Sequence, residues 1–125
     1  MSGHAGLFSD AVDLLTFGEI FLRTWKVDST TMEFARRQEV VPGSSRALGW
    51  DTPSPNGTAG HYLAITSVGH TGFTGPSIWM DPTRDLVIVV LGNRVHPTRA
   101  NAKWGDLSVR GGVADRVVNG LDAAP

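Results

Sequence analysis

The hydrophobic positions in the first part of the chain repeat with helical spacing. Four large apolar residues recur every three or four positions: Leu14, Phe17, Phe21 and Trp25. This spacing places them on one face of a helix, and Ser9 followed by Asp10 is typical of an N-cap with an acidic first turn. We therefore expect an amphipathic helix over residues 9–26. Ser29 favours the start of a second, shorter helix that ends near Gln38.

The middle of the chain changes to short apolar runs bounded by Gly, Pro and Asp, which are typical of β-strands. Three strands are predicted, over residues 67–71, 77–80 and 86–92. A shorter strand candidate spans residues 47–50. Because the loops between the three main strands are short, the strands should pair as an antiparallel meander. The last strand is apolar without alternation from Leu86 to Leu91, which indicates burial on both faces and a central place in the sheet.

The end of the chain predicts another amphipathic helix. Its apolar residues lie four positions apart, with two more beside them: Val109, Val113, Val117 and Leu121, then Ala114 and Val118. Gly111 and Gly112 fall inside this helix and weaken it by up to about 1 kcal/mol each unless close packing requires them. The expected fold class is α+β, an antiparallel sheet of about three strands flanked by an N-terminal and a C-terminal helix. We expect residues 1–125 to form a single domain.

Composition and charge exclude several classes of function. The 125 residues are 41% hydrophobic, enough for a core, and 11 basic residues against 12 acidic ones give a net charge of -1. We therefore expect neither nucleic acid nor a membrane surface as a partner. The N-terminus lacks the basic-then-apolar layout of a signal peptide, so the chain as expressed is expected in the cytoplasm and its natural compartment stays open.

The residues that bind metals are few and scattered. The chain has no cysteine, which excludes thiol nucleophiles, zinc-thiolate sites and iron–sulfur clusters. Its four histidines show no close His-x-His or His-x-x-x-His spacing: His4, His61, His70 and His96. We expect no metal and no cofactor.

The segment 69–75 combines an ionisable ring, hydroxyl groups and three glycines at the end of a predicted strand. Glycines of this kind let a backbone approach a ligand closely. On the pattern alone, a hairpin turn with an exposed histidine remains the favoured interpretation.

Further motifs follow this segment in order, and they change that interpretation. They are His70-Thr71-Gly72, Phe73-Thr74-Gly75-x-Ser77-x-Trp79-x-Asp81-Pro82, the strand from Leu86 to Leu91, and Asn93-Arg94-Val95-His96-Pro97. Together they resemble the C-terminal part of the serine β-lactamase-like hydrolases, which include class C β-lactamases, penicillin-binding proteins and related esterases. Residues 2–9 resemble the glycine-rich start of a late helix in that family, and residues 45–51 resemble the strand before its active-site strand.

The resemblance implies that segment 70–73 lines one wall of an active site. His70 and Thr71 would bind the carboxylate or carbonyl side of a substrate, and Gly72 would leave room for it. The backbone N–H of Phe73 would donate to the oxyanion. We also expect Thr74 and Trp79 to contact substrate.

A site that works alone needs a base and a hydroxyl from this chain. His70 is the expected base, with His61 and His96 as alternatives, because histidine side chains titrate near neutral pH. The hydroxyl candidates are Thr71, Thr74 and Ser77, and the sequence does not choose among them.

The family's own nucleophile is missing from this sequence. No serine has a lysine three positions later, and Ala64 stands two places after the single tyrosine, Tyr62, where a Tyr-x-Asn motif would have Asn. An unassisted hydroxyl is a poor nucleophile at neutral pH. Two hypotheses follow. In the first, the chain is a fragment or a minimal form of a β-lactamase-family hydrolase that acts on carboxylic esters. In the second, it is a non-catalytic unit that binds ligand and complements an N-terminal partner. A structural domain without activity is a third possibility.

Two further expectations depend on the resemblance. A lysine in place of His70 would attract a β-lactam carboxylate more strongly than a neutral imidazole does, so His70 favours neutral esters. In the family, the strand from Leu86 to Leu91 pairs with an N-terminal strand that this chain lacks. We therefore expect self-association through that strand edge.

Overall fold

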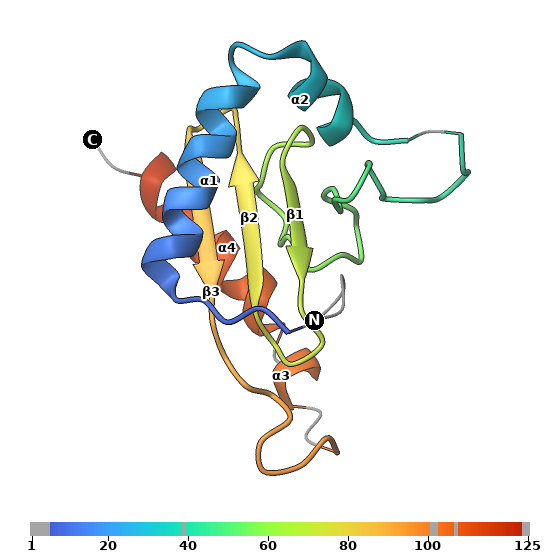
Figure 1. The fold of residues 1–125 in the computed structure, drawn as a ribbon. Coiled ribbons are helices and arrows are strands. Elements are labelled where there is room, and N and C mark those ends of the chain that lie inside the picture. The colour runs from blue at the N-terminus through green and yellow to red at the C-terminus, as the bar shows by residue number, and fades with distance from the viewer. Residues whose placement is uncertain (1–5, 39, 101–102, 107, 124–125) are drawn as a thin grey trace.

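The β-meander predicted for the middle of the chain forms the centre of the computed structural model, which describes residues 6–38, 40–100, 103–106 and 108–123. Strands β1 (Val68–Thr71), β2 (Ser77–Asp81) and β3 (Leu86–Val90) pair antiparallel in the order β1-β2-β3 (Figure 1). Helices lie on both faces of this sheet, which confirms the α+β class. The first five residues, including His4 and most of the glycine-rich start of segment 2–9, fall outside the described ranges.

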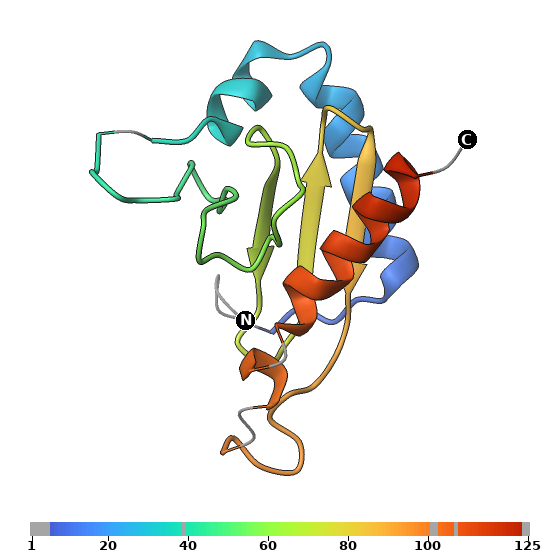
Figure 2. The same ribbon diagram turned by 180° about the vertical axis from the view of Figure 1, so that it is seen from behind.

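The four helices are α1 (Ala11–Trp25), α2 (Ser29–Ala35), α3 (Lys103–Asp106) and α4 (Val109–Asp122). Figure 1 shows α1 across one face of the sheet, and Figure 2 shows α4 across the opposite face. None of the helices in the described ranges is both long and apolar enough to cross a membrane.

Helix α1 forms where the sequence predicts it, but with a different cap and a different buried face. Asp10, not Ser9, is the N-cap, and its carboxylate accepts from the Val12 and Asp13 amides at 2.9 Å each. The buried residues of the helix are Gly18 and Leu22. A Cβ on Gly18 would lie 2.5 Å from a methyl group of Val87, so this glycine sets where the helix touches β3. The aromatic side chains that the spacing selects flank that contact instead of forming its centre.

Strand β3 corrects the prediction of a central place in the sheet. In the described part of the chain, its one strand neighbour is β2, so β2 occupies the centre and β3 forms an edge. Its uninterrupted apolar sequence has another cause: α1 contacts it from one face and α4 from the other.

The core divides into two clusters, one on each face of the sheet. The cluster between the sheet and helices α1 and α2 consists of Leu22, Ala35, Val68 and Met80. The cluster between the sheet and α4 consists of Ala59, Leu63, Trp79, Ile88, Ala114 and Val118. Because neighbouring strand residues point to opposite faces, β2 supplies Met80 to one cluster and Trp79 to the other.

Helix α4 buries Gly111 and the two predicted neighbours Ala114 and Val118, whereas the predicted stripe from Val109 to Leu121 contributes only the partly buried Val113 to this core cluster. The close packing that would justify a helical glycine is present at Gly111, where a Cβ would lie 3.2 Å from the backbone of Gly60. Leu121 is half exposed. The helix therefore packs on the sheet through Val113, Ala114 and Val118, while Gly111 lies against the loop at Gly60.

The segment 47–50 does not form a strand. Isolated bridges join Arg46 to Asp51 and Asp51 to Gly69. The Asp51 amide donates to the Gly69 carbonyl at 2.7 Å, and the Gly69 amide donates to the Asp51 carbonyl at 3.0 Å. Asp51 thus pairs with Gly69 at the outer edge of β1. This pairing brings the neighbouring Arg46 close to that strand.

The loop before β1 is joined to α4 by His61 and Asp115. The Asp115 carboxylate contacts the His61 ring at 2.8 Å and accepts from the His61 amide at 2.5 Å. Partial burial alone would raise the pKa of Asp115, but these contacts with His61 outweigh burial and lower it. Folding is thus coupled to ionisation of Asp115.

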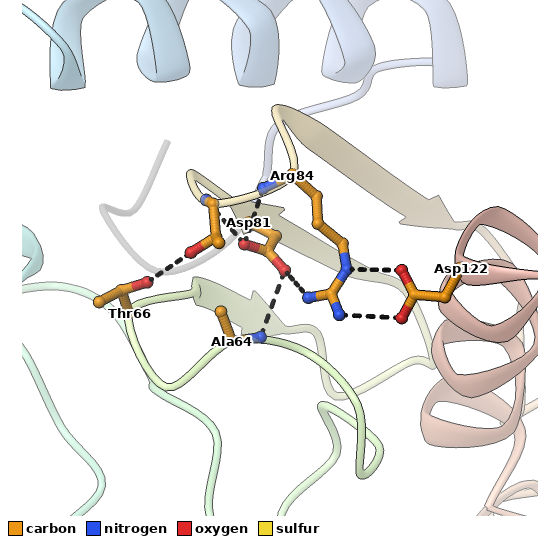
Figure 3. Close-up of polar contacts among 6 residues, drawn as sticks. Ala64, Thr66, Asp81, Arg84 and Asp122 are labelled. Carbon is orange, nitrogen blue, oxygen red and sulfur yellow. Dashed lines mark hydrogen bonds and ion pairs between the residues drawn. The ribbon is translucent and has the colours of Figure 1, made fainter.

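A fully buried carboxylate closes the far end of β2 (Figure 3). Asp81 is 0% exposed and accepts from the amides of Ala64 and Thr83 and from the Arg84 guanidinium, at 3.2, 2.9 and 3.0 Å. Arg84 also forms two hydrogen bonds to Asp122 at the end of α4, at 3.3 and 3.1 Å. The hydrogen bonds to Asp122 and then to Asp81 raise the pKa of Arg84. The β2–β3 turn, the loop before β1 and the end of α4 meet at this network.

We expect Asp81→Ala to lower the free energy of unfolding by about 3 kcal/mol or more, because it leaves buried donors without an acceptor. Urea denaturation measures the loss. Asp122→Ala, at the exposed end of the same network, should cost much less. Equal losses in the two variants would contradict the role assigned to the buried carboxylate.

We expect Asp115 to stabilise the fold above about pH 4, the range of an unfolded carboxyl, and to lose that contribution as the pH falls through its lowered folded pKa. Unfolding by urea at neutral and acidic pH, compared between the wild type and Asp115→Asn, measures this. The stability difference should shrink as the solution is acidified. A difference independent of pH would exclude the coupling.

Candidate active-site wall

The turn between β1 and β2 places the predicted site residues at the edge of the sheet. The Gly75 amide donates to the Gly72 carbonyl at 3.1 Å, and the Gly72 amide donates to the Pro76 carbonyl at 2.8 Å. Gly75 has a φ of +125°, a conformation that side chains disfavour. Segment 72–75 is therefore a tight turn built on glycine at both ends.

The carbonyl oxygens of the turn accept hydrogen bonds from the side chains of two arginines that come later in the chain. Arg94 Nε donates to the Phe73 carbonyl at 2.6 Å, and its guanidinium lies 4.5 Å from the centroid of the Phe73 ring. Arg110, in the first turn of α4, donates to the carbonyls of Gly72 and Gly75 at 2.9 Å each. Burial and, to a smaller degree, the charge of Arg94 lower the pKa of Arg110.

His70 is exposed, and both of its ring nitrogens have contacts. Nδ1 lies 3.0 Å from the Thr71 carbonyl, and Nε2 lies 3.5 Å from Nη1 of Arg46. A neutral ring with its hydrogen on Nδ1 satisfies both contacts, because the carbonyl only accepts and the guanidinium only donates. Among the described residues, no hydroxyl group is hydrogen-bonded to His70.

The Phe73 amide is the donor that the turn leaves open. Within the described ranges, its N–H has no hydrogen-bond partner, and its side chain is 64% exposed. Arg99 lies on the same ring at 5.7 Å. An N–H without a partner, in a turn contacted by guanidinium groups, is suited to an oxygen that becomes negative.

The other predicted site residues divide between surface and interior. Thr74 is exposed and its carbonyl accepts from the Arg94 amide at 2.7 Å, and Thr71 is half-buried. Ser77 and Trp79 are 5% and 2% exposed. Trp79 belongs to the core below α4, so its ring is not available to substrate, and the buried Ser77 hydroxyl is a poor candidate nucleophile.

The alternative bases do not join this site. His61 is bonded to Asp115 on α4, and His96 is exposed in the loop after β3. Neither contacts His70 in the parts of the chain that the structure describes. Those parts also contain no group of three histidine or acidic side chains placed to hold a metal ion.

Three arginines that contact the site residues were not predicted from the sequence: Arg46, Arg94 and Arg110. Arg46 adjoins the predicted strand 47–50, so pairing of that segment with β1 could have suggested its position. Arg94 belongs to a motif already recognised, but its side-chain contact needs the three-dimensional structure. No local signal identifies Arg110, because its partners lie 35 and 38 positions earlier.

Comparisons with known proteins agree with the resemblance. The Beta-lactamase family model matches residues 1–110. A putative D-alanyl-D-alanine carboxypeptidase of Salmonella paratyphi B is 35% identical over 113 residues, which cover 82% of this chain and 26% of the relative. Its counterpart in Salmonella gallinarum is 36% identical, with the same coverage.

A structural relative gives the same result. The crystal structure of a beta-lactamase from Mycobacterium bovis superposes with a TM-score of 0.66 and 28% identity, covering 89% of this chain and 44% of that one. The chain thus spans 26% of the length of the curated Salmonella relatives. Because the family model matches residues 1–110, the chain belongs to the β-lactamase family.

Proposed function

We propose that this chain forms the substrate-facing wall of a β-lactamase-family hydrolase that acts on carboxylic esters. The observation that carries the proposal is the Phe73 N–H, which has no hydrogen-bond partner among the described residues and belongs to a turn hydrogen-bonded to Arg94 and Arg110. Attack on an ester carbonyl turns its oxygen into an oxyanion. A fixed N–H directed at that oxygen lowers the barrier, and loss of one such donor costs about 10²- to 10³-fold in rate.

The nucleophile comes from outside this sequence in our proposal. No Ser-x-x-Lys motif is present, and His70 turns its two nitrogens to a carbonyl and to a cation and not to a hydroxyl. A base whose lone pair faces Arg46 is poorly placed to take a proton from Thr71 or Thr74. These contacts support the complementing unit over the self-sufficient minimal hydrolase.

An exposed apolar groove supports the need for a further part of the protein. It has a volume of about 340 Å³ and runs between α1 and α2, lined by Phe17, Ile20, Phe34 and Trp50 among others. Ile20 and Phe34 are 57% and 52% exposed. We infer that the groove is covered by a further part of the hydrolase that this sequence does not include.

The preference for esters depends on the charge near His70. Its imidazole alone attracts a carboxylate less than lysine would. Arg46, 3.5 Å away, adds a permanent positive charge that the sequence argument did not include. We therefore expect the wall to accept esters that carry a carboxylate as well as neutral ones.

Hydrolysis of p-nitrophenyl butyrate tests this function. We expect the purified chain alone to match the buffer blank, and turnover to appear when a polypeptide with the family's Ser-x-x-Lys motif is added. In that mixture His70→Ala should lower kcat/KM by up to about tenfold, the cost of one hydrogen bond, because it removes the ring that contacts Arg46 in the wall.

His96→Ala, which removes an exposed histidine outside the wall, is the matched control and should retain the rate of the mixture. No turnover by the mixture would contradict the proposed function. Turnover by the chain alone that His70→Ala abolishes would instead establish a minimal hydrolase.

We also propose that, without a complementing part, two chains pair through the open edge of β3. Light scattering over a range of concentrations should show dimers or larger species. Leu91→Lys places a charge beside that edge and should shift the chain toward monomer. Leu121→Lys, the same substitution at an exposed position of α4, should not. A clean monomer at every concentration would refute the pairing.

A further inference from the structure

The carbonyl oxygens of the β1–β2 turn all accept hydrogen bonds. Gly72 and Gly75 accept from the Arg110 side chain, Phe73 accepts from the Arg94 side chain, and Thr74 accepts from the Arg94 amide. Arg110 differs from Arg94 because its guanidinium joins the first and last residues of the turn.

The contact at Gly72 has a geometric consequence for the next amide. The peptide between Gly72 and Phe73 is trans, since the only cis bond in the described chain lies between His96 and Pro97. In a planar trans peptide, the C=O and the following N–H point in opposite directions. By holding the Gly72 oxygen at 2.9 Å, Arg110 directs the Phe73 N–H away from itself.

We propose that Arg110 is a positioning residue that orients the Phe73 N–H as the oxyanion donor. This inference rests on the proposed function, because it assigns a task to the donor on which that function depends. Arg110 acts through the backbone and does not touch the substrate.

The rest of the structure explains why the turn needs this support. Glycine at both ends gives the turn a large conformational freedom, and its backbone hydrogen bonds, from Gly75 to Gly72 and from Gly72 to Pro76, leave the Phe73 N–H itself without a partner among the described residues. The guanidinium is planar and presents donors at fixed spacing, so two carbonyls bonded to it keep a fixed separation. A lysine ammonium offers no such fork.

Helix α4 gives Arg110 a rigid base. The next residue, Gly111, packs against the backbone of Gly60, and Ala114 and Val118 are 1% and 0% exposed in the core below the sheet. The orientation of the turn is thus linked to the docking of α4 on β2 and β3.

NMR on the ¹⁵N-labelled chain tests the orientation directly, without turnover. The measurements are the residual dipolar coupling and the order parameter of the Phe73 N–H, with the Trp79 and Met80 amides of β2 as internal references. We expect a rigid Phe73 amide in the wild type, with an order parameter of about 0.85, and a fall below about 0.6 in Arg110→Met, together with a changed coupling.

Arg110→Lys should resemble Arg110→Met, because it keeps the charge but not the two-point contact. Arg116→Met, an exposed arginine on the same helix, should leave the Phe73 amide unchanged. The β2 amides should be unaffected in all three variants.

An unchanged Phe73 coupling and order parameter in Arg110→Met would overturn the proposal. If Arg110→Met fails to fold, Arg110→Lys decides: a Phe73 amide that stays oriented in it, or unfolding of both variants, also overturns the proposal, since the role would then be general stability.

Titration with methylphosphonate, a tetrahedral anion, separates this inference from the proposed function. We expect it to shift the Phe73 amide signal in the wild type and to shift it less in Arg110→Met. No response in the wild type would contradict the oxyanion role itself, whatever the dipolar couplings show. A wild-type response that Arg110→Met fully retains would contradict only the positioning role.

Discussion

The structure depends on β2, which is hydrogen-bonded to a strand on each side and covered by helices on each face. Met80 and Trp79 point in opposite directions, so a single strand supplies a large buried residue to each core cluster. A shift of one residue in its register would exchange the two faces and place Trp79 below α1. The register therefore determines both where α4 docks and where the turn before β2 lies.

The two ends of β2 use arginine in different ways. At the Asp81 end, the guanidinium of Arg84 forms ion pairs with the carboxylates of both Asp81 and Asp122, so its positive charge is fully compensated (Figure 3). At the turn, Arg94 and Arg110 donate to neutral backbone carbonyls, so their positive charge is not cancelled by those contacts. One end thus pairs charges of opposite sign, and the other concentrates the positive charge of two arginines at the turn.

The sequence predicts the sheet well because period-two patterns and turn residues are local signals. The sequence predicts the position of α1 along the chain but not which of its faces is buried, because the contact of Gly18 with Val87 is long-range. The prediction that β3 lies in the centre of the sheet is wrong for a related reason: apolar residues on both faces of a strand do not show whether a strand or a helix lies beside it. His70 and Phe73 could be selected from motifs, whereas Arg110 reaches the turn only because α4 packs on the sheet.

We propose that this chain orients a substrate and leaves the attacking hydroxyl to another segment. Whether the chain alone can be acylated is the most direct test of this division of roles. Intact mass spectrometry after incubation with excess p-nitrophenyl butyrate gives the answer, with the folded state checked in parallel. We predict an unchanged mass. A single butyryl adduct that maps to Thr71, Thr74 or Ser77 and is lost in His70→Ala would contradict the account.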